Sequence, residues 1–402
     1  MSDLLGEVSL AEISNKISYG YTASATSKNT GVKFLRITDI VPERIDWESV
    51  PFCEISESDY QKYKINTGDI LIARTGATTG YNKTITNLPY PAVYASYLIK
   101  YDLHTENVSP YFVKYILQSS LWYDYVSAVS GGSAQPGANA KVLGSFKFSL
   151  PPLPEQKAIA SVLSALDDKI DLLQRQNQTL EQMAATLFRQ WFIEEAKEDW
   201  EDGYINQMIS LQNGYAFKSK DFSEIGIYKI IKIKNIDNKI VDIVNTDFVS
   251  EDIAKQCADK FQIKNGAILI AMTGAEIGKL GIVPKNSDNL LLNQRVGMFL
   301  PKFNGAEFLA YLYFITDYGQ EYIWNAATGS AQPNISGYQI EQAPFPIIPT
   351  SQLEQYGSRI KPYFDKLIDN LGQIQTLQSL RDTLLPKLIS GEVRLKGFEA
   401  VS

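Results

Sequence analysis

The longest regular pattern in the chain is a heptad repeat that begins just after a proline-rich stretch. From Pro154 onward, apolar side chains recur at alternating steps of four and three residues, with Asn177 as the polar member. The positions of this seam are Ile159, Leu163, Leu166, Ile170, Leu173, Asn177, Leu180, Ala184, Leu187 and Trp191. The stretch contains no internal glycine or proline, so the pattern predicts one helix of about 38 residues, roughly 57 Å long.

A second and less regular seam lies near the C-terminal end, shifted by 197 residues. Its positions are Tyr356, Ile360, Tyr363, Leu367, Asn370, Ile374, Leu377, Arg381, Leu384 and Leu388. Pro362, Gly372 and Pro386 interrupt it, so we expect this helix to begin late or to kink near Pro362. Because a single helix cannot bury its own seam, we expect the two helices to pair as an antiparallel coiled coil. The alternative is that each helix packs on its own globular region.

The same shift relates many other parts of the sequence. The five residues GSAQP occur at Gly132–Pro136 and again at Gly329–Pro333, and the segment Ile70–Gly80 closely matches Ile268–Gly278 at a shift of 198. Matches kept in order across both halves indicate a tandem duplication of a whole domain with its connector. Each GSAQP follows an aromatic helical stretch and precedes a proline-rich strand, so we interpret it as a structural junction rather than a ligand contact.

The fold class predicted from these patterns is α+β. Short apolar runs that enter glycine turns indicate strands, so each repeat should be a β-rich globular domain followed by a long helix. The chain should thus contain two duplicated domains separated by two paired long helices with pseudo-two-fold symmetry. The predicted boundaries are a first domain at 1–150, a helix at 151–195, a second domain at 196–349, a helix at 350–391 and a tail at 392–402.

Composition agrees with large folded domains. The chain has 402 residues, of which 45% are hydrophobic and 21% charged, and no apolar run approaches the length of a membrane span. Its N-terminal residues are acidic where a signal peptide would be basic. Cys53 and Cys257 lie in opposite halves without metal-binding spacing, so we expect neither disulfide nor zinc, and a cytoplasmic location.

The net charge of −7 is concentrated in the connector between the two repeats. Residues 151–202 contain 5 basic and 11 acidic side chains, whereas residues 1–150 and 203–349 each contain 13 basic and 14 acidic ones. Each of the two repeats therefore has enough positive side chains to form a local basic surface, although solvated surface lysines would give the same count.

Sequence patterns typical of catalysis are incomplete. The glycine turn Gly274–Leu280 is one residue too short for a phosphate-binding loop and lacks its terminal hydroxyl, and Asn87–Tyr90 (NLPY) only partly matches a methyltransferase motif. His104 is the single histidine. We therefore expect no catalytic residues, no metal and no cofactor in this chain.

Several sequence segments together resemble those of the specificity subunit of Type I restriction–modification enzymes. They are the segments Leu150–Leu173, Thr186–Phe192, Asn213–Phe222, Gly329–Ile335 and Leu380–Leu395. The resemblance covers essentially the whole chain. It implies that each globular domain is a target recognition domain reading one half of a bipartite site in double-stranded DNA, and that the helix pair sets the spacer.

The same resemblance implies the partners. Two methyltransferase subunits would dock on the helices and carry S-adenosylmethionine, and motor/nuclease subunits would complete the restriction complex. No membrane is involved.

Basic side chains near the predicted strands and turns are the candidates for DNA contact, since arginine can bind guanine through two hydrogen bonds and lysine more often contacts phosphate. The predicted DNA-binding residues are Lys28, Lys33, Arg36, Arg74, Lys83, Lys218, Lys220, Lys232, Lys234, Lys279 and Arg295. Met272 occupies the position of Arg74 in the second repeat, as expected if the domains read different sequences.

Two other functions fit parts of the pattern. A protein-binding scaffold with two modules on a coiled coil would also be duplicated and non-catalytic. A lone methyltransferase would require a cofactor fingerprint, which we do not find in the sequence.

Overall fold

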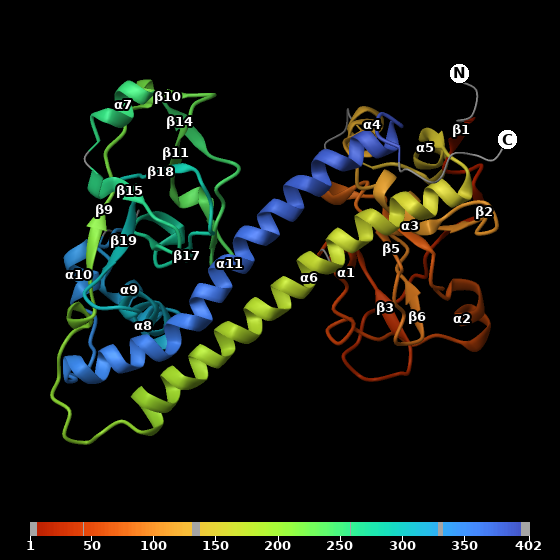
Figure 1. Ribbon diagram of the computed structural model, residues 1–402. Helices are drawn as coiled ribbons and strands as arrows, with labels where there is room; N and C mark the ends of the chain where they lie inside the picture. The colour runs from red at the N-terminus through yellow and green to blue at the C-terminus, as the bar shows by residue number, and fades with distance from the viewer. Residues whose placement is uncertain (1–5, 43, 131–136, 258, 329–332, 395–402) are drawn as a thin grey trace. The chain divides into compact units, whose positions relative to one another are not determined.

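The computed structural model describes residues 6–42, 44–130, 137–257, 259–328 and 333–394. The chain packs into two compact units: unit 1 comprises Met1–Asp168 and Ser379–Ser402, and unit 2 comprises Lys169–Gln378. Each unit combines β-sheets with helices (Figure 1), so the predicted α+β class is confirmed. The predicted GSAQP junctions, Gly132–Pro136 and all but the last residue of Gly329–Pro333, lie outside the described residues, as does most of the predicted tail.

The core of unit 1 is a four-stranded antiparallel sheet in the order β2-β7-β4-β5. Its strands are β2 (Ser14–Tyr19), β7 (Leu98–Leu103), β4 (Ile70–Ala73) and β5 (Asn82–Thr84). Two further pairings complete the β-structure of the unit: β3 (Lys33–Leu35) runs parallel to β6 (Ala92–Tyr94), and β1 (Gly6–Ser9) runs antiparallel to β8 (Lys147–Leu150).

Strand β4 lies between two hydrophobic cores. Ile70 and Ile72 pack with the helices of the unit, whereas Leu71 and Ala73 pack with Leu35 and its neighbours on the opposite face. Successive side chains of a strand point to opposite faces, so a strand covered on both sides is apolar throughout. This explains the unbroken apolar run in the sequence.

Short capped helices surround this sheet. They are α1 (Ile37–Ile40), α2 (Glu57–Tyr63), α3 (Pro110–Ile116), α4 (Ser120–Ser130) and α5 (Ala140–Gly144). The side chains of Ser56, Ser109 and Asn139 accept a backbone N–H in the first turn of α2, α3 and α5. Pro110 occupies the first turn of α3, where a missing N–H costs nothing.

Unit 2 has a comparable arrangement of strands and helices, with additional strands in its sheets. Its main sheet has the order β12-β13-β17-β16-β19-β9, and its second sheet the order β10-β14-β11-β18-β15. The main-sheet strands are β12 (Ile236–Asp237), β13 (Ile240–Val241), β17 (Leu280–Ile282), β16 (Ile268–Ala271), β19 (Val296–Pro301) and β9 (Ile209–Asn213). The second-sheet strands are β10 (Phe222–Ser223), β14 (Asp247–Val249), β11 (Tyr228–Ile231), β18 (Asn289–Leu292) and β15 (Gln262–Ile263).

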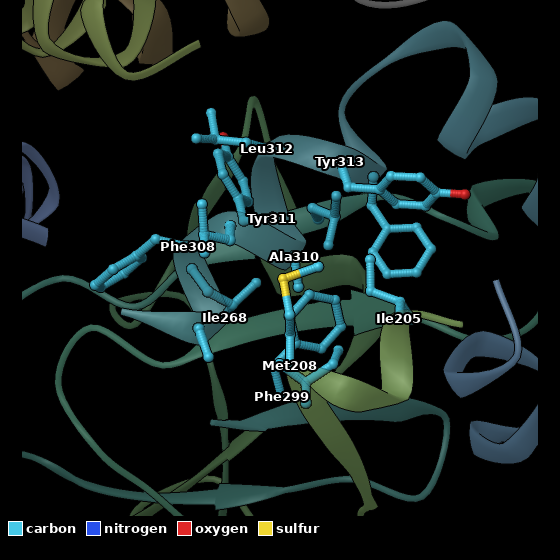
Figure 2. Close-up of a cluster of buried hydrophobic side chains, with 14 of the residues drawn as sticks. Ile205, Met208, Ile268, Phe299, Phe308, Ala310, Tyr311, Leu312 and Tyr313 are labelled. Carbon is cyan, nitrogen blue, oxygen red and sulfur yellow. The ribbon is translucent and has the colours of Figure 1, made fainter. Parts of the chain in front are cut away.

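The helices of unit 2 are α7 (Glu251–Lys255), α8 (Ala306–Phe314), α9 (Asp317–Ala326) and α10 (Gly337–Glu341). Helix α8 is buried on almost every side. Figure 2 shows its residues Phe308 and Tyr311 beside Met208, Ile268 and Phe299, which belong to the same hydrophobic core. A helix that is apolar all round is typical of a core position, so α8 fixes the sheet to the long helices packed on it.

Equivalent backbone contacts recur in both units. The Arg74 N–H donates to the Tyr97 carbonyl at 3.1 Å, and the Met272 N–H donates to the Arg295 carbonyl at 3.0 Å. Strands β9-β19-β16-β17 correspond in order to β2-β7-β4-β5. The predicted internal duplication is therefore confirmed.

A close backbone approach is also repeated. A Cβ atom on Gly20 would lie 2.2 Å from the Ala95 carbonyl oxygen, and one on Gly214 would lie 2.2 Å from the Asn293 carbonyl oxygen. Neither glycine has room for any side chain, so both copies require glycine at this position.

The two long helices are α6 (Leu153–Arg189), which continues into a π-helical turn at Gln190–Glu194, and α11 (Thr350–Ile389). Of the two alternatives expected for the second helix, a late start near Pro362 is wrong, because α11 begins at Thr350. A kink near Pro362 stays a prediction. Pro362 is exposed. The carbonyl that loses its N–H donor there can be hydrated, which reduces the cost of a proline inside the helix.

Both long helices contribute to each unit, where their segments lie side by side (Figure 1). In unit 2, Trp191 stacks on Tyr356 with ring centroids 4.3 Å apart, and Asn370 Nδ2 donates to Asn177 Oδ1 at 2.9 Å. Residue numbers rise along one helix as they fall along the other, so these two segments run in opposite directions. Phe364 of α11 also stacks on Phe308 at 4.4 Å, so the helices contact the globular part of unit 2 as well as each other.

In unit 1, a charged network joins the two helices. Asp167 accepts hydrogen bonds from Lys114 Nζ at 2.9 Å, from the Tyr115 hydroxyl at 2.7 Å and from Arg381 Nη1 at 3.0 Å. Burial opposes ionisation, but the Lys114 charge and these hydrogen bonds outweigh it and hold the pKa of Asp167 below its usual range.

The side chains predicted for the helix interface are all at least half-buried. Those fully buried are Ile159, Leu163, Ile170, Leu173, Leu367, Ile374 and Leu388. Those half-buried are Leu166, Asn177, Leu180, Leu187, Leu377 and Leu384.

Candidate nucleic-acid interface

One end of the repeated four-strand core carries polar side chains in each unit, and in unit 1 it also carries exposed aromatic side chains. In unit 1, β2 and β4 end where β5 and β7 begin, because neighbouring strands are antiparallel. Arg74 follows β4, Tyr97 precedes β7, Tyr19 ends β2 and Tyr81 precedes β5. We call this end of the sheet the strand-end surface of its unit.

Arg74 is the only cation at these four positions of unit 1. Its guanidinium carbon lies 4.9 Å from the centre of the Tyr19 ring, which holds the side chain by a cation–π contact. Its Nε has no hydrogen-bond partner among the described residues. Tyr97, whose carbonyl fixes the Arg74 backbone, is 57% exposed. The arrangement leaves a positioned guanidinium, whose buried Nε has no partner among the described residues, beside an accessible aromatic ring.

Unit 2 has different side chains at the equivalent positions. Met272 replaces Arg74 and is buried, Arg295 replaces Tyr97, Lys279 replaces Tyr81 and Asn213 replaces Tyr19. Arg295 is exposed and makes no ion pair with any other described residue. The arginine of the strand-end surface therefore stands at the end of one strand in unit 1 and at the start of the neighbouring strand in unit 2, where Lys279 adds a second cation.

Lys279 has its charge partly balanced within unit 2. Its ammonium lies 2.8 Å from a Glu276 carboxylate oxygen and 3.2 Å from one of Asp237. Hydrogen bonds to Glu276 and Asp237 raise the pKa of Lys279, so it stays protonated.

The prediction that Lys33 contacts DNA is wrong. Its side chain is only 4% exposed, and its ammonium donates to the backbone carbonyls of Val50 at 2.7 Å and Glu48 at 3.1 Å. The same ammonium lies 4.2 Å from the centre of the Phe52 ring. Lys33 is a buried residue that ties β3 to the segment around Glu48 and Val50, because a buried charge must be satisfied internally.

Two other predicted cations of unit 1 are held by neighbours. Arg36 forms a bidentate pair with Asp39, and hydrogen bonding to that carboxylate raises the pKa of Arg36. The Lys83 ammonium donates to the Pro42 carbonyl at 2.6 Å. Lys28 is exposed in a loop.

In unit 2, Lys232 and Lys234 share one carboxylate. Their ammonium groups lie 2.9 and 3.0 Å from the same Asp247 oxygen, and Lys232 also lies 3.6 Å from the centre of the Phe222 ring. Lys218 and Lys220 are exposed in the segment that precedes β10. These lysines therefore gather around the second sheet rather than at the strand-end surface.

Sequence reasoning missed Tyr19, Tyr97 and Tyr81. The signal was available, because applying the 198-residue shift to Arg295 and Lys279 gives Tyr97 and Tyr81. Tyr19 could not be found this way, since only the strand pairing places it beside Arg74.

Within the described ranges, no group of three or more His, Cys, Asp or Glu side chains is arranged to hold a metal ion. Among the helices of the described residues, none combines the length and hydropathy that a bilayer crossing requires.

Comparison with known proteins gives consistent matches over the whole chain. The Type I restriction modification DNA specificity domain matches twice, at residues 5–182 and 197–378. The specificity subunit of the Type I restriction enzyme MjaVIII from Methanocaldococcus jannaschii is 25% identical over 358 residues, covering 83% of this chain and 81% of the relative. The MjaIX specificity subunit from the same organism is 26% identical over 315 residues, covering 71% of this chain and 69% of the relative.

A solved structure shares the fold. The crystal structure of the Type I restriction–modification system S subunit from M. genitalium superposes with a TM-score of 0.61 at 16% identity, covering 97% of each chain. The double match of the specificity domain accounts for the two units and for the repeated strand core. The chain belongs to the family of Type I restriction–modification DNA specificity subunits, as the sequence phrases predicted.

Proposed function

We propose that this chain recognises a bipartite DNA target for a Type I restriction–modification system, with each unit reading one half of the target. The observation that carries the proposal is the strand-end surface. Two units with the same backbone present Arg74 with Tyr19 in one case and Arg295 with Met272 in the other. Two copies of a reader diverge in this way when each reads a different sequence.

The two arginines are the proposed base-reading residues. A guanidinium can donate two hydrogen bonds to one guanine, which is worth about 1–3 kcal/mol of discrimination against the wrong base. Arg74 is already oriented by the Tyr19 ring, so it loses little side-chain entropy on binding. The buried Met272 in unit 2 offers no such donor.

The remaining cations are proposed to contact phosphates. In unit 1 they are Lys28, Arg36 and Lys83, and in unit 2 they are Lys218, Lys220, Lys232, Lys234 and Lys279. Phosphate contacts fix the position of the protein on the duplex without reading sequence. Several of these residues have a carboxylate partner in the free protein, so DNA must compete with that partner.

Helices α6 and α11 are proposed to pair along their length as an antiparallel coiled coil with pseudo-two-fold symmetry. The opposite direction of the segments in unit 2 and the Asp167–Arg381 contact in unit 1 support this pairing. A helix of about 38 residues is roughly 57 Å long, which corresponds to between one and two turns of B-DNA. The pair would thereby set the unread spacer between the two half-sites.

The catalytic steps are proposed to belong to partner proteins. Methyltransferase subunits would dock on the helices and bind S-adenosylmethionine, and motor/nuclease subunits would join them. Residues 1–150 and 203–349 are each close to neutral. Nearly neutral recognition domains can still bind DNA if the partner proteins supply much of the phosphate-binding charge.

The test is methylome sequencing of cells that express this chain with its methyltransferase partner. The unmodified chain should give one bipartite motif. Arg74→Ala should relax one half of the motif and Arg295→Ala the other, with the spacer unchanged. A motif that keeps full stringency in both variants would contradict the assignment of the readers.

The competing functions give different results. A protein scaffold would produce no motif at all that depends on this chain. A lone methyltransferase would bind labelled S-adenosylmethionine as the isolated chain, without a partner.

A further inference from the structure

Unit 2 contains an aromatic cavity of about 630 Å³ where α6 ends. Six aromatic side chains line it: Phe188, Phe192, Tyr204, Tyr313, Tyr318 and Phe345. They come from the end of α6, from α8 and α9, and from the two segments around Tyr204 and Phe345. The volume is within the range of sites that hold a ligand or a large side chain.

The walls of this cavity are held in place before anything binds. The Tyr313 ring lies edge-on to Phe345 at 5.8 Å and to Tyr318 at 6.0 Å. The Gly203 carbonyl accepts the Phe345 N–H at 3.0 Å, and the Glu201 carbonyl accepts the Ile347 N–H at 2.8 Å. Asp202 lies between these two backbone contacts, so this lining residue belongs to a fixed segment.

Two of the residues that line the cavity carry polar groups, one exposed and one buried. Asp202 is exposed, and it is the one charged residue among those that line the cavity. Tyr313 is 5% exposed, and its hydroxyl has no hydrogen-bond partner among the described residues. Figure 2 shows this hydroxyl pointing away from the other labelled side chains of the core. Burial raises the pKa of Tyr313, so the hydroxyl stays neutral and can accept an N–H.

These groups together select a cation. Aromatic faces attract a guanidinium or ammonium group, a carboxylate pairs with it, and the free hydroxyl can accept one of its hydrogens. An anion would meet the Asp202 charge, and a purely apolar group would leave the Tyr313 hydroxyl unsatisfied.

The rim of the cavity indicates a protein as the source of the cation. Ile193 and Tyr318, which line the cavity, are 63% and 56% exposed, and Ile347, which follows the lining residue Pro346, is 51% exposed. Apolar groups exposed together at one place are typical of protein interfaces. The adjacent segment 194–202 contains six acidic residues and one lysine, which disfavours nucleic acid and favours a basic polypeptide.

We propose that this cavity receives an arginine or lysine side chain from a protein partner, whose neighbouring apolar residues cover the rim. The cation inserts between the aromatic rings, pairs with Asp202 and donates to the Tyr313 hydroxyl. A buried cationic side chain in an aromatic pocket is a common energetic centre of a protein interface. The cavity and the strand-end surface share no residue, so the proposal for the cavity can be tested independently of DNA recognition.

The test uses the full-length chain labelled with 3-fluorotyrosine and observed by fluorine NMR. The probe is the peptide acetyl-Leu-Arg-Leu-amide, and its matched control carries citrulline, which has the same shape without the charge. Tyr204→Phe and Tyr318→Phe variants assign two of the signals. We expect the arginine peptide to shift the signals of Tyr204, Tyr313 and Tyr318, and the citrulline peptide to bind at least about five-fold more weakly.

Charge variants complete the experiment. Asp202→Asn should weaken binding of the arginine peptide about five-fold. Asp199→Asn removes the same charge from the same acidic segment but does not line the cavity, so it should leave binding unchanged.

Four outcomes would overturn the proposal. They are no shift with the arginine peptide, equal binding of the citrulline peptide, equal loss in the Asp199→Asn and Asp202→Asn variants, and displacement of the peptide by a short DNA duplex. The last would assign the cavity to nucleic acid.

Discussion

Units 1 and 2 place different chemistry on the same backbone, and they do so at two kinds of position. At the strand-end surface, Arg74 of unit 1 is replaced by Met272 in unit 2, while Tyr97 is replaced by Arg295. At the long helices, Asp167 of unit 1 is replaced by Phe364. The first replacement changes what the unit can bind, and the second changes how the unit is held together.

The helix position shows how the two solutions differ. In unit 1, Tyr115 donates to the ionised Asp167, which also pairs with Arg381. In unit 2, the equivalent Tyr311 lies edge-on to Phe364 at 5.6 Å, and its hydroxyl donates instead to Glu181 at 2.6 Å. Hydrogen bonds and ion pairs are directional, so the charged network of unit 1 fixes the positions of its side chains. The apolar contact of unit 2 instead stabilises the unit by burying apolar surface.

The strongest test of the shared backbone is the repeated glycine. Gly20→Ala and Gly214→Ala should each destabilise their own unit by about 3 kcal/mol, because the new Cβ would overlap a carbonyl oxygen. Hydrogen exchange resolved by mass spectrometry would report each unit separately. Gly6→Ala is the matched control, since a Cβ there meets no atom within 4 Å. Normal protection of unit 1 in Gly20→Ala would contradict the close approach.

The charged network of unit 1 gives the next largest effect. Asp167→Asn should destabilise unit 1 by about 2 kcal/mol, because Lys114 loses its carboxylate and Arg381 keeps only its contact with Asp382. Unit 2 should be unaffected, and the neighbouring exposed Asp168→Asn should change neither unit. Urea unfolding of the variants, combined with hydrogen exchange, would measure this.

The same network has a predictable pH dependence. The pKa of Asp167 is lower in the folded chain than its ordinary value of 3.8, so its contribution is present above that value. The contribution is lost as the pH falls through the lowered folded pKa. The stabilities of the parent chain and Asp167→Asn should therefore converge at acid pH, and a constant difference down to the folded pKa would contradict the assignment.

A smaller effect is expected from the asparagine pair of unit 2. Asn177→Leu and Asn370→Leu should each cost about 1 kcal/mol, because each leaves a partner amide buried without its hydrogen bond. The double variant should recover most of this loss, with a coupling energy of about 1 kcal/mol. Strict additivity in the double-mutant cycle would show that the two amides act separately.

The smallest effect concerns the exposed lysines. Lys28→Ala in unit 1 and Lys218→Ala in unit 2 should weaken DNA binding by the assembled complex equally for target and non-target duplexes. Each should lower the dependence of log affinity on log salt by about one. Titrations at several salt concentrations would measure this, and a change in target preference would show that the lysine reads a base.

The long helices and the duplication could be predicted from the sequence, because both depend on spacing alone. The seam of α6 predicted the buried positions Leu163 and Ile170. The seam of α11 did not predict that Phe364 and Ile368 would also be buried. Their burial depends on the globular part of unit 2, which packs against a second face of α11. A late start near Pro362, one of the two alternatives expected there, does not occur, because exposure of that residue lowers the cost of the proline.

The candidate site was less predictable. Lys33 was indistinguishable in sequence from a surface lysine, because the carbonyls that bind its ammonium belong to Glu48 and Val50, well along the chain. Arg74 was found, but its stacking partner Tyr19 was not, since β2 and β4 come together only through β7. Contacts made across a sheet leave no local trace in the sequence.

The division of the chain into units has a consequence for biosynthesis. Unit 2 is a continuous stretch, Lys169–Gln378, whereas unit 1 needs Ser379–Ser402 to complete it. Leu163 of α6 therefore stays without its α11 neighbours Leu385 and Leu388 until the ribosome has made all of unit 2. Domains generally fold as they emerge, so the second unit to be synthesised can be the first to be finished, and the first must wait with an uncovered apolar helix face.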